Sequence, residues 1–437
     1  MQSIDLLIEP RWVIPIEPHG VTLENHAVAI DAGRIVALLP AEEARLRFQA
    51  RDTLRLAQHC VLPGLVNLHT HAAMSLLRGY ADDMALMDWL SQRIWPAEAR
   101  YVSTAFVRDG TLLACAEMLR GGITCFNDMY FHPEAAAEAV LRMGMRAALG
   151  VLAIEFPTAY AADADDYLAK GLATRDALRD EPLISFCMAP HAPYTVSDTS
   201  FERIATLSAQ LDLPIHLHLH ETLGEIQDSV KQYGVRPIQR LHRLGLLGPN
   251  LIAVHAVHLD ADEVDLLAEQ GCSIAHCPTS NLKLASGIAP VAAMSRRGLR
   301  IGLGSDGAAS NNRLDLFREM NHAALLAKVD SGDATVLDAH SVLRMATLDG
   351  AAALGQEQRI GSLLAGKQAD LCAVRLDDPS LLPCFNPAAH LVHVAGREHV
   401  SHVWVAGEAR VADGRLLGTD PAELLDIANL WHNKLDF

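Results

Sequence analysis

The stretch VLPGLVNLHTH, residues 61–71, is an apolar run that ends in two histidines one residue apart. Alternate residues of a β-strand point to the same face, so His69 and His71 would project together where this strand ends. Neutral imidazole is the commonest protein ligand for metal ions. The pair alone could equally form a polar rim, so a metal site requires further ligands from elsewhere in the chain.

The composition is that of a large globular protein. The chain has 437 residues, of which 50% are hydrophobic and 20% are charged. Acidic residues exceed basic ones by 53 to 36 and no run is rich in lysine or arginine, which disfavours nucleic acid and anionic membranes as partners. The eight cysteines are scattered without a Cys-x-x-Cys pair, which indicates reduced thiols. Neither a signal peptide nor an apolar run of about 20 residues is evident, so we expect a cytoplasmic protein without a membrane span.

Two kinds of pattern divide the chain. Short runs rich in β-branched residues, separated by turns, predict strands near the start at residues 5–8, 13–16, 26–30, 34–39 and 53–55. Longer apolar runs then alternate with helical stretches, and the predicted strands cover residues 65–68, 124–127, 147–152, 184–188, 215–220, 251–255, 273–276 and 301–304. The predicted helices between them include residues 103–120, 133–143, 198–211 and 261–270. Short strands return at residues 370–375, 390–394, 402–405 and 409–411.

Eight strands interleaved with helices over about 240 residues predict an α/β protein with a TIM-like (β/α)8 barrel, which usually takes about 250 residues. A doubly wound open sheet is the alternative, but no Gly-x-Gly-x-x-Gly follows the first strand. We expect the barrel to occupy residues 63–360. It would be inserted in a small composite β-sandwich built from residues 1–62 and residues 361–437, the latter including a C-terminal tail.

Reactive side chains stand at the carboxyl ends of five predicted barrel strands, where the active sites of such barrels lie. These side chains are His69, His71, His191, His216, His218, His220, Glu221, His255 and Asp306. A single histidine at a strand end is more often structural than a ligand. Five strands that deliver histidine or aspartate to the same layer therefore predict a metal site.

Three imidazoles and one carboxylate around a water would suit Zn²⁺ or Fe²⁺, and the ligand types alone do not choose between them. Bound Zn²⁺ lowers the pKa of water to about 7, and a nearby carboxylate must then move protons. Glu221 is placed for that role. The histidines 216, 218 and 220 share one strand face, so periodicity cannot select the ligand among them.

Several segments resemble the amidohydrolase superfamily, and within it most closely the 5-methylthioadenosine/S-adenosylhomocysteine deaminases. They read PGLVNLHTHAAMSLLRGYADD, APHAPYT, HLHLHE, VHAVHL, HCPTSNLKLASGIAPV and LGSDGAASNN. A later segment, GSLLAGKQADLCAV, resembles the return of the chain into that superfamily's small composite β-domain. The resemblance spans about residues 60–375.

The resemblance implies the ligand set. His69, His71, His218 and Asp306 would hold one divalent metal per subunit, expected to be Zn²⁺, with Fe²⁺ or another divalent ion as the alternative. The choice of His218 follows the superfamily's His-x-x-Glu pattern, which ends here at Glu221. The fourth strand lacks an obvious bridging lysine, so a single metal is favoured over two.

The resemblance also implies the catalytic roles. Glu221 would shuttle protons to the substrate ring, and His255 would hold the attacking water. Asp306 would accept a proton from that water. Glu221 and Asp306 would both contact the substrate as well.

Further substrate contacts follow from the same resemblance. Glu98 falls where the ribose 2′- and 3′-hydroxyls are bound, and His191 falls where a histidine contacts the purine. Trp89 and Ser310 match positions near the substrate, although packing and helix capping would explain them as well. An arginine that some members carry after the third strand appears here as Leu149. Recognition of the ribose 5′ substituent therefore stays open.

The expected reaction is hydrolytic deamination of adenine nucleosides, 5′-methylthioadenosine and/or S-adenosylhomocysteine, to the inosine analogue and ammonia. We expect a homo-oligomer that binds this small molecule. One alternative is an amidohydrolase that acts on guanine, cytosine or a triazine. Another is a non-catalytic scaffold of the same fold, but the complete ligand set and Glu221 argue against it.

Overall fold

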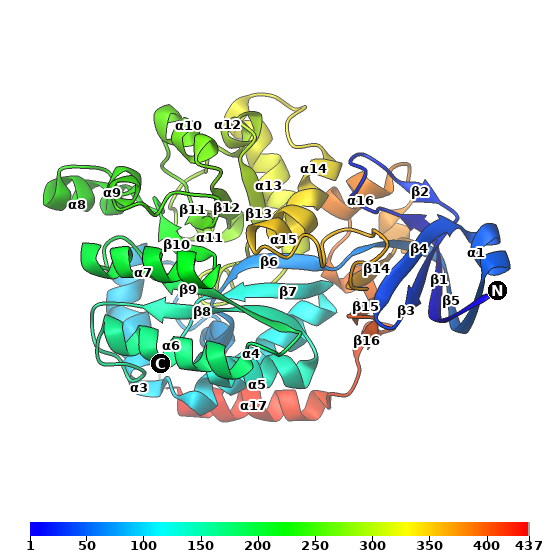
Figure 1. Ribbon diagram of the computed structural model, residues 1–437, viewed down its shortest axis with the longest axis horizontal. Helices are drawn as coiled ribbons and strands as arrows, with labels where there is room; N and C mark the ends of the chain where they lie inside the picture. Colours follow the sequence, from blue (N-terminus) through cyan, green and yellow to red (C-terminus); the bar gives the residue numbers. More distant parts are fainter. Residues whose placement is uncertain (436–437) are drawn as a thin grey trace.

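The computed structural model describes residues 1–435, and one of its two sheets has eight strands that follow one another in chain order (Figure 1). All seven ladders between neighbours are parallel. The strands are β6 (Leu65–Thr70), β7 (Ile123–Asp128), β8 (Arg146–Ala153), β9 (Ile184–Pro190), β10 (Ile215–Leu219), β11 (Leu251–His255), β12 (Ser273–His276) and β13 (Arg300–Leu303). The predicted barrel is therefore confirmed, and the open-sheet alternative is wrong.

Side chains and close backbone packing join the first barrel strand to the last. Asn67, the one polar interruption of the opening apolar run, donates from Nδ2 to Ser305 Oγ at 2.7 Å. Its Oδ1 accepts from the Ser305 backbone N–H at 2.8 Å. A Cβ added at Gly302 would approach Leu68 Cδ2 to 2.6 Å, so the seam has no room for a side chain there. Asn67 is fully buried, and its two bonds satisfy it.

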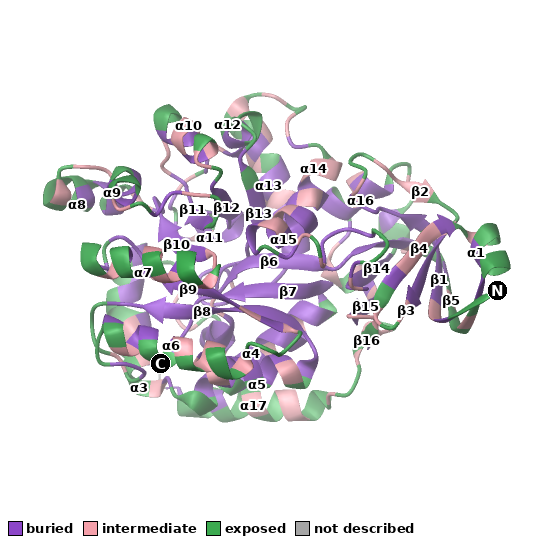
Figure 2. Ribbon diagram, in the orientation of Figure 1, coloured by how far each residue is buried: buried purple, intermediate pink, exposed green. Residues whose placement is uncertain are grey.

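Helices cover the outside of the barrel, with exposed outer faces around buried strands (Figure 2). They are α2 (Leu86–Trp89), α3 (Trp95–Tyr101), α4 (Thr104–Arg120), α5 (Pro133–Met143), α6 (Ala164–Leu178), α7 (Asp198–Leu211), α8 (Leu223–Tyr233), α9 (Pro237–Arg243), α10 (Ala261–Glu269), α11 (Pro278–Lys283), α12 (Val291–Arg296), α13 (Leu316–Ser331), α14 (Ala339–Arg344) and α15 (Gly350–Ala353). The four helices predicted from the sequence are present within one or two residues of the expected bounds. No helix among residues 1–435 is long and apolar enough to cross a membrane.

A second, mixed sheet of nine strands lies at one end of the barrel (Figure 1). Its strands are β1 (Gln2–Val13), β2 (Leu23–Glu24), β3 (His26–Asp31), β4 (Arg34–Pro40), β5 (Phe48–Pro63), β14 (Leu371–Arg375), β15 (Val400–Val405), β16 (Glu408–Ala412) and β17 (Arg415–Leu416), with α1 (Ala41–Arg47) at its edge. The antiparallel pairing of β14 with β5 joins the late strands to the early ones. Both ends of the chain thus build one sheet, as expected, while the exact division into domains stays a prediction.

Two details differ from the expected pattern. The strand predicted at residues 390–394 is wrong, because most of that segment belongs to helix α16 (Pro387–His393). Asn386 caps this helix by accepting a hydrogen bond from the Ala389 N–H at 3.1 Å, which outweighs the β-branched residues. The C-terminal tail contains helix α17 (Pro421–Lys434), which packs against α4 of the barrel (Figure 1). Trp431 donates from its indole to Asp109 there, at 2.9 Å.

The seam between β6 and β13 yields a stability prediction. Asn67→Ala would leave the buried N–H of Ser305 without an acceptor, which typically costs about 1–3 kcal/mol. We expect the free energy of unfolding in urea to fall by about that amount. Asn433→Ala, on the exposed face of α17, serves as the matched control and should change little. Equal urea midpoints for Asn67→Ala and wild type would contradict the role of Asn67 in the seam.

Candidate active site

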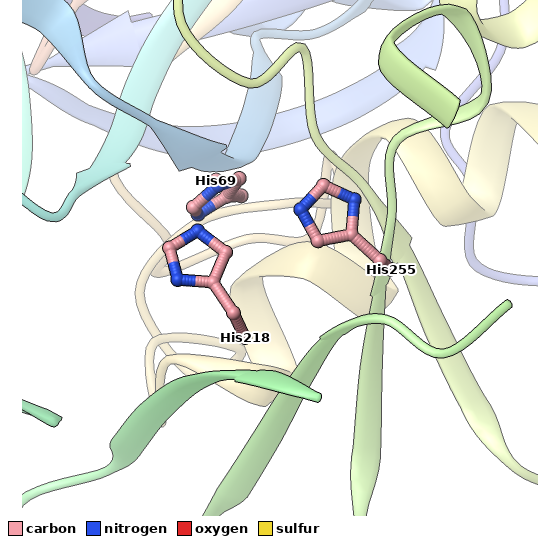
Figure 3. Close-up of side chains that lie close together, drawn as sticks. All are labelled: His69, His218 and His255. Carbon is pink, nitrogen blue, oxygen red and sulfur yellow. The ribbon is translucent and has the colours of Figure 1, made fainter. Parts of the chain in front are cut away.

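The carboxyl ends of β6, β10, β11 and β13 bring the predicted metal ligands together. His69 lies in β6 and His71 directly follows it, while His218 lies in β10 and Asp306 comes three residues after β13. The imidazoles of His69, His218 and His255 face one another in Figure 3. Ligand atoms of these three histidines lie within 4.8 Å of one another, as do those of His69, His71 and Asp306.

One oxygen of Asp306 lies close to two of the imidazoles. The distance from Asp306 Oδ1 to His69 Nε2 is 3.2 Å, and the distance to His71 Nε2 is 3.3 Å. His69 is fully buried, yet its Nε2 has no hydrogen-bond partner within the described chain. An unpartnered buried nitrogen is costly unless something else binds it. A cation between these atoms would satisfy it.

Hydrogen bonds to backbone carbonyl oxygens set the tautomers of two histidines. His71 Nδ1 lies 2.6 Å from the carbonyl oxygen of Met129, and His218 Nδ1 lies 2.7 Å from that of His191. Because a carbonyl oxygen can only accept, both Nδ1 atoms must carry the hydrogen. The lone pairs of both Nε2 atoms therefore face the cluster, which is the arrangement that metal-binding histidines usually show.

The protonation states also suit a divalent cation. Burial lowers the pKa of His69 to about 4 and that of His218 well below its ordinary value, so both rings are neutral at pH 7. The carboxylate of Asp306 accepts hydrogen bonds from the hydroxyls of Ser280 and Ser310, which favour its ionised form. Metal ligands must be deprotonated, and this set meets the requirement.

Two of these residues have a backbone conformation that is unfavourable for side-chain-bearing residues. His255 has φ of 70° and Asp306 has φ of 61°. Such left-handed positions cost about 1–3 kcal/mol and persist only where surrounding contacts impose them. For Asp306 those contacts include the hydroxyls of Ser280 and Ser310, which donate to Oδ2 at 2.6 Å and 2.7 Å. The strain is typical of functional sites.

Glu221 lies two residues after the end of β10 and is held beside His255. Its Oε2 lies 3.8 Å from His255 Nε2, and burial raises the pKa of its carboxyl. The backbone N–H groups of His220 and Glu221 both donate to the carboxylate of Glu225, each at 2.9 Å. The position of Glu221 is therefore fixed by a second buried acid one helical turn later.

A cavity of about 360 Å³ opens over this cluster. The predicted site residues that line it are His71, Trp89, Glu98, His191, His218, Glu221, His255, Asp306 and Ser310. The tenth, His69, is fully buried and reaches the cluster through Asp306. Nine of the ten residues predicted from the sequence therefore line one cavity. Their individual roles stay predictions.

The contacts of the predicted substrate-binding residues differ in kind. Glu98, on α3, accepts a hydrogen bond from the hydroxyl of Tyr130 at 2.8 Å, and burial raises the pKa of its carboxyl to about 7. Ser310 is turned toward Asp306, and Trp89 donates from its indole to the carbonyl of Ala81 at 3.0 Å. These bonds occupy the Ser310 hydroxyl and the Trp89 indole, whereas Glu98 has acceptor capacity left.

The structure corrects one detail of the expected cavity. Leu149, identified with the position of an arginine, lies in the middle of β8 and does not line the cavity. Leu152 and Ile154, farther along the same segment, line it instead.

Four residues that support the site were not assigned a role from the sequence. Ser280 bonds Asp306, Asn281 Oδ1 lies 2.9 Å from His255 Nδ1, Glu225 holds the backbone at residue 221, and Tyr130 bonds Glu98. Ser280 and Asn281 belong to the HCPTSN segment, which resembles the amidohydrolase superfamily but to which no individual roles were assigned. The other two are revealed only by contacts in space.

Comparison with known proteins agrees with this geometry. Residues 60–410 match the model of the amidohydrolase family. The chain belongs to this family. It is 46% identical over 433 residues to the 5-methylthioadenosine/S-adenosylhomocysteine deaminase of Teredinibacter turnerae, covering 99% of this chain and 98% of that protein. It is 43% identical to the protein of the same name from Saccharophagus degradans, covering 99% and 97% of the two chains. The expected resemblance is confirmed.

Solved structures of this amidohydrolase's relatives share its fold. The crystal structure of an adenosine deaminase from Xanthomonas campestris with bound zinc superposes with a TM-score of 0.98, at 50% identity and 99% coverage of both chains. An atrazine chlorohydrolase from Arthrobacter aurescens, complexed with zinc, has a TM-score of 0.90 at 24% identity, covering 98% and 99%. The second likeness shows the fold alone.

The ligand geometry yields a prediction on metal content. After reconstitution with zinc and removal of excess, we expect elemental analysis to find about one equivalent per chain, because the two ligand groups share His69. The double variant His69→Ala/His71→Ala should lose most of it. His242→Ala, which changes an exposed histidine on α9, is the control and should keep it. Two equivalents in the wild type, or full zinc in the double variant, would contradict this site.

Proposed function

We propose that this amidohydrolase hydrolytically deaminates the adenine ring of nucleosides, 5′-methylthioadenosine and/or S-adenosylhomocysteine, to the inosine analogue and ammonia. The observation that supports it most directly is Glu98. Its carboxyl stands in the wall of the same cavity as Glu221 and His255, with acceptor capacity to spare. The names of the relatives from Teredinibacter turnerae and Xanthomonas campestris point to the same class of substrate.

In this proposal His69, His71, His218 and Asp306 hold one divalent metal, for which zinc is the first candidate. When bound, such a metal lowers the pKa of the attacking water and makes it a nucleophile at neutral pH. This ion fits the neutral imidazoles of His69 and His218, the ionised carboxylate of Asp306 and the unpartnered Nε2 of His69.

Three residues act on the attacking water and on the protons of the reaction. His255 Nε2 orients the attacking water toward C6 of the purine, and Asp306 accepts a proton from it. Glu221 gives a proton to N1 of the ring as the water oxygen bonds to C6. Burial raises the pKa of Glu221, so its carboxyl holds a proton more readily than an exposed glutamate does.

The leaving group departs in the second half of the reaction. Of the two water protons, one passes to the exocyclic amine, so that the C6–N bond breaks and ammonia leaves. The other returns to Glu221 and replaces the proton that Glu221 gave to N1. The product ring then has a carbonyl at C6 and a hydrogen on N1. Glu221 needs two positions for this shuttle, and its contact with His255 at 3.8 Å is loose enough to allow them.

The substrate contacts complete the proposal. Glu98 accepts hydrogen bonds from the ribose 2′- and 3′-hydroxyls, and charge-assisted bonds of this kind are strong. His191, with Trp89 and Ser310 nearby, borders the space for the purine. Guanine, cytosine and triazines have no ribose, so they would leave Glu98 without these donors in a partly dry cavity. Nothing in the cavity specifically favours those substrates.

Glu221→Gln tests the proton shuttle. An amide cannot exchange protons in this way, and general acid–base groups typically contribute about 10²–10⁴-fold to the rate. We expect kcat to fall by about that factor, with zinc content unchanged. Glu202→Gln, an exposed position on α7, is the control. A loss below about tenfold, with chemistry rate-limiting, would remove Glu221 from this role.

Glu98→Ala tests the ribose contact. A site built to bind a polar group rejects analogues that lack it by up to about 10⁴-fold. We expect Glu98→Ala to lower kcat/KM for methylthioadenosine strongly, and 2′-deoxyadenosine to be poorer than adenosine in the wild type only. Tyr130→Phe should give a smaller loss, because it removes one bond to Glu98 and keeps the carboxylate. A Glu98→Ala variant as active as wild type on nucleosides would rule out this contact.

A further inference from the structure

We propose that Trp95 and Phe156 form an apolar subsite that selects nucleosides with a short, uncharged 5′ substituent, such as methylthio, over the charged tail of S-adenosylhomocysteine. This inference rests on the proposed function, in which Glu98 binds the ribose. It concerns two residues to which no role has been assigned above.

The first observation is the charge of the cavity. The residues that line it, all within the described part of the chain, include neither lysine nor arginine. Its charged members are acids, namely Glu98, Glu221 and Asp306. The homocysteine tail carries an ammonium group and a carboxylate. The ammonium group could pair with one of these acids, but the carboxylate would lose water in this cavity without gaining a cationic side chain. An unpaired charge is costly to bury, so the cavity disfavours that tail.

The second observation is the position of Trp95 beside Glu98. Both lie on α3, three residues apart, so their side chains project from the same face of that helix. One helical turn is about 5.4 Å. The 5′ carbon of a ribose held at Glu98 would therefore lie within reach of the indole. Trp95 and Glu98 both line the cavity.

Phe156 meets Trp95 from a different segment. It follows β8, and its ring centroid lies 6.0 Å from that of Trp95 at an interplanar angle of 62°. The loop is anchored on both sides of the ring. The Glu155 N–H donates to the Thr195 carbonyl at 3.0 Å, and the Thr158 N–H donates to the Ala161 carbonyl at 2.9 Å. These bonds hold the backbone on either side of Phe156, whose ring is 39% exposed and forms part of the cavity wall.

This aromatic pair suits a thioether. Sulfur makes favourable contacts with the edges and faces of aromatic rings, and a methyl group gains from leaving water. One apolar group in a hydrophobic pocket typically contributes about 10–200-fold to discrimination. Methylthioadenosine should therefore exceed both adenosine and S-adenosylhomocysteine in kcat/KM, by about tenfold or more.

The test compares ammonia release from these three nucleosides by the zinc-loaded protein. The wild type should show the tenfold preferences given above. Phe156→Ala should reduce the preference for methylthioadenosine over adenosine by about fivefold or more, because the apolar contact is lost. Phe385→Ala, which changes an exposed phenylalanine that does not line the cavity, should leave the preference unchanged. Phe156→Arg adds a cation that can pair with the carboxylate of the tail. It should raise kcat/KM for S-adenosylhomocysteine, relative to kcat/KM for methylthioadenosine, by about tenfold.

The outcomes separate this inference from the proposed function. Comparable kcat/KM for methylthioadenosine and S-adenosylhomocysteine in the wild type would overturn the subsite and leave nucleoside deamination in place. An unchanged methylthioadenosine-to-adenosine ratio in Phe156→Ala, with zinc content intact, would also overturn it. Absence of ammonia from all three nucleosides would overturn the proposed function, and this inference with it.

Discussion

The meeting of the first and last barrel strands is the constraint on which the site depends. His69 lies in β6 and His71 directly follows it, whereas Asp306 comes from just beyond β13, more than 230 residues later in the chain. The backbone N–H of Asp306 donates to the carbonyl of His69 at 3.0 Å, so the same seam that joins the barrel also positions three predicted ligands. Gly304 is needed at this seam, because a Cβ at that position would lie 2.8 Å from His69 Cβ.

Burial is the main cause of the shifted pKa values in the site. It keeps His69 and His218 neutral, raises the pKa of Glu98 to about 7, and raises that of Glu225 to about 8. A stable fold gains little from placing so many titratable groups out of water, and such clusters are typical of sites that bind or react. Backbone strain at His255 and Asp306 points the same way. The features that cost folding stability thus gather where the proposed chemistry takes place.

The sequence predicted the barrel because parallel strands buried on both faces are continuous apolar runs, and their histidine endings marked the active face. Local sequence patterns predicted the structure less well where capping or tertiary contacts determine the conformation. Asn386 made a helix of residues 387–393, and the sequence could not show that Leu149 lies too early in β8 to line the cavity. The choice of His218 among three histidines on one strand face required the resemblance. The hydrogen bonds of Tyr130 and Asn281 join segments far apart in sequence, and only the folded chain reveals them.

In the proposed reaction, the cavity binds an aminated purine as its nucleoside and releases the amine as ammonia. The most direct measurement is ammonia release by the zinc-loaded protein from a panel of adenosine, guanine, cytosine and aminotriazines at matched concentrations. We expect adenosine to be turned over and the compounds without ribose to be turned over far more slowly. Fastest turnover of guanine, cytosine or an aminotriazine would contradict the nucleoside assignment, while the barrel and its metal site would stand.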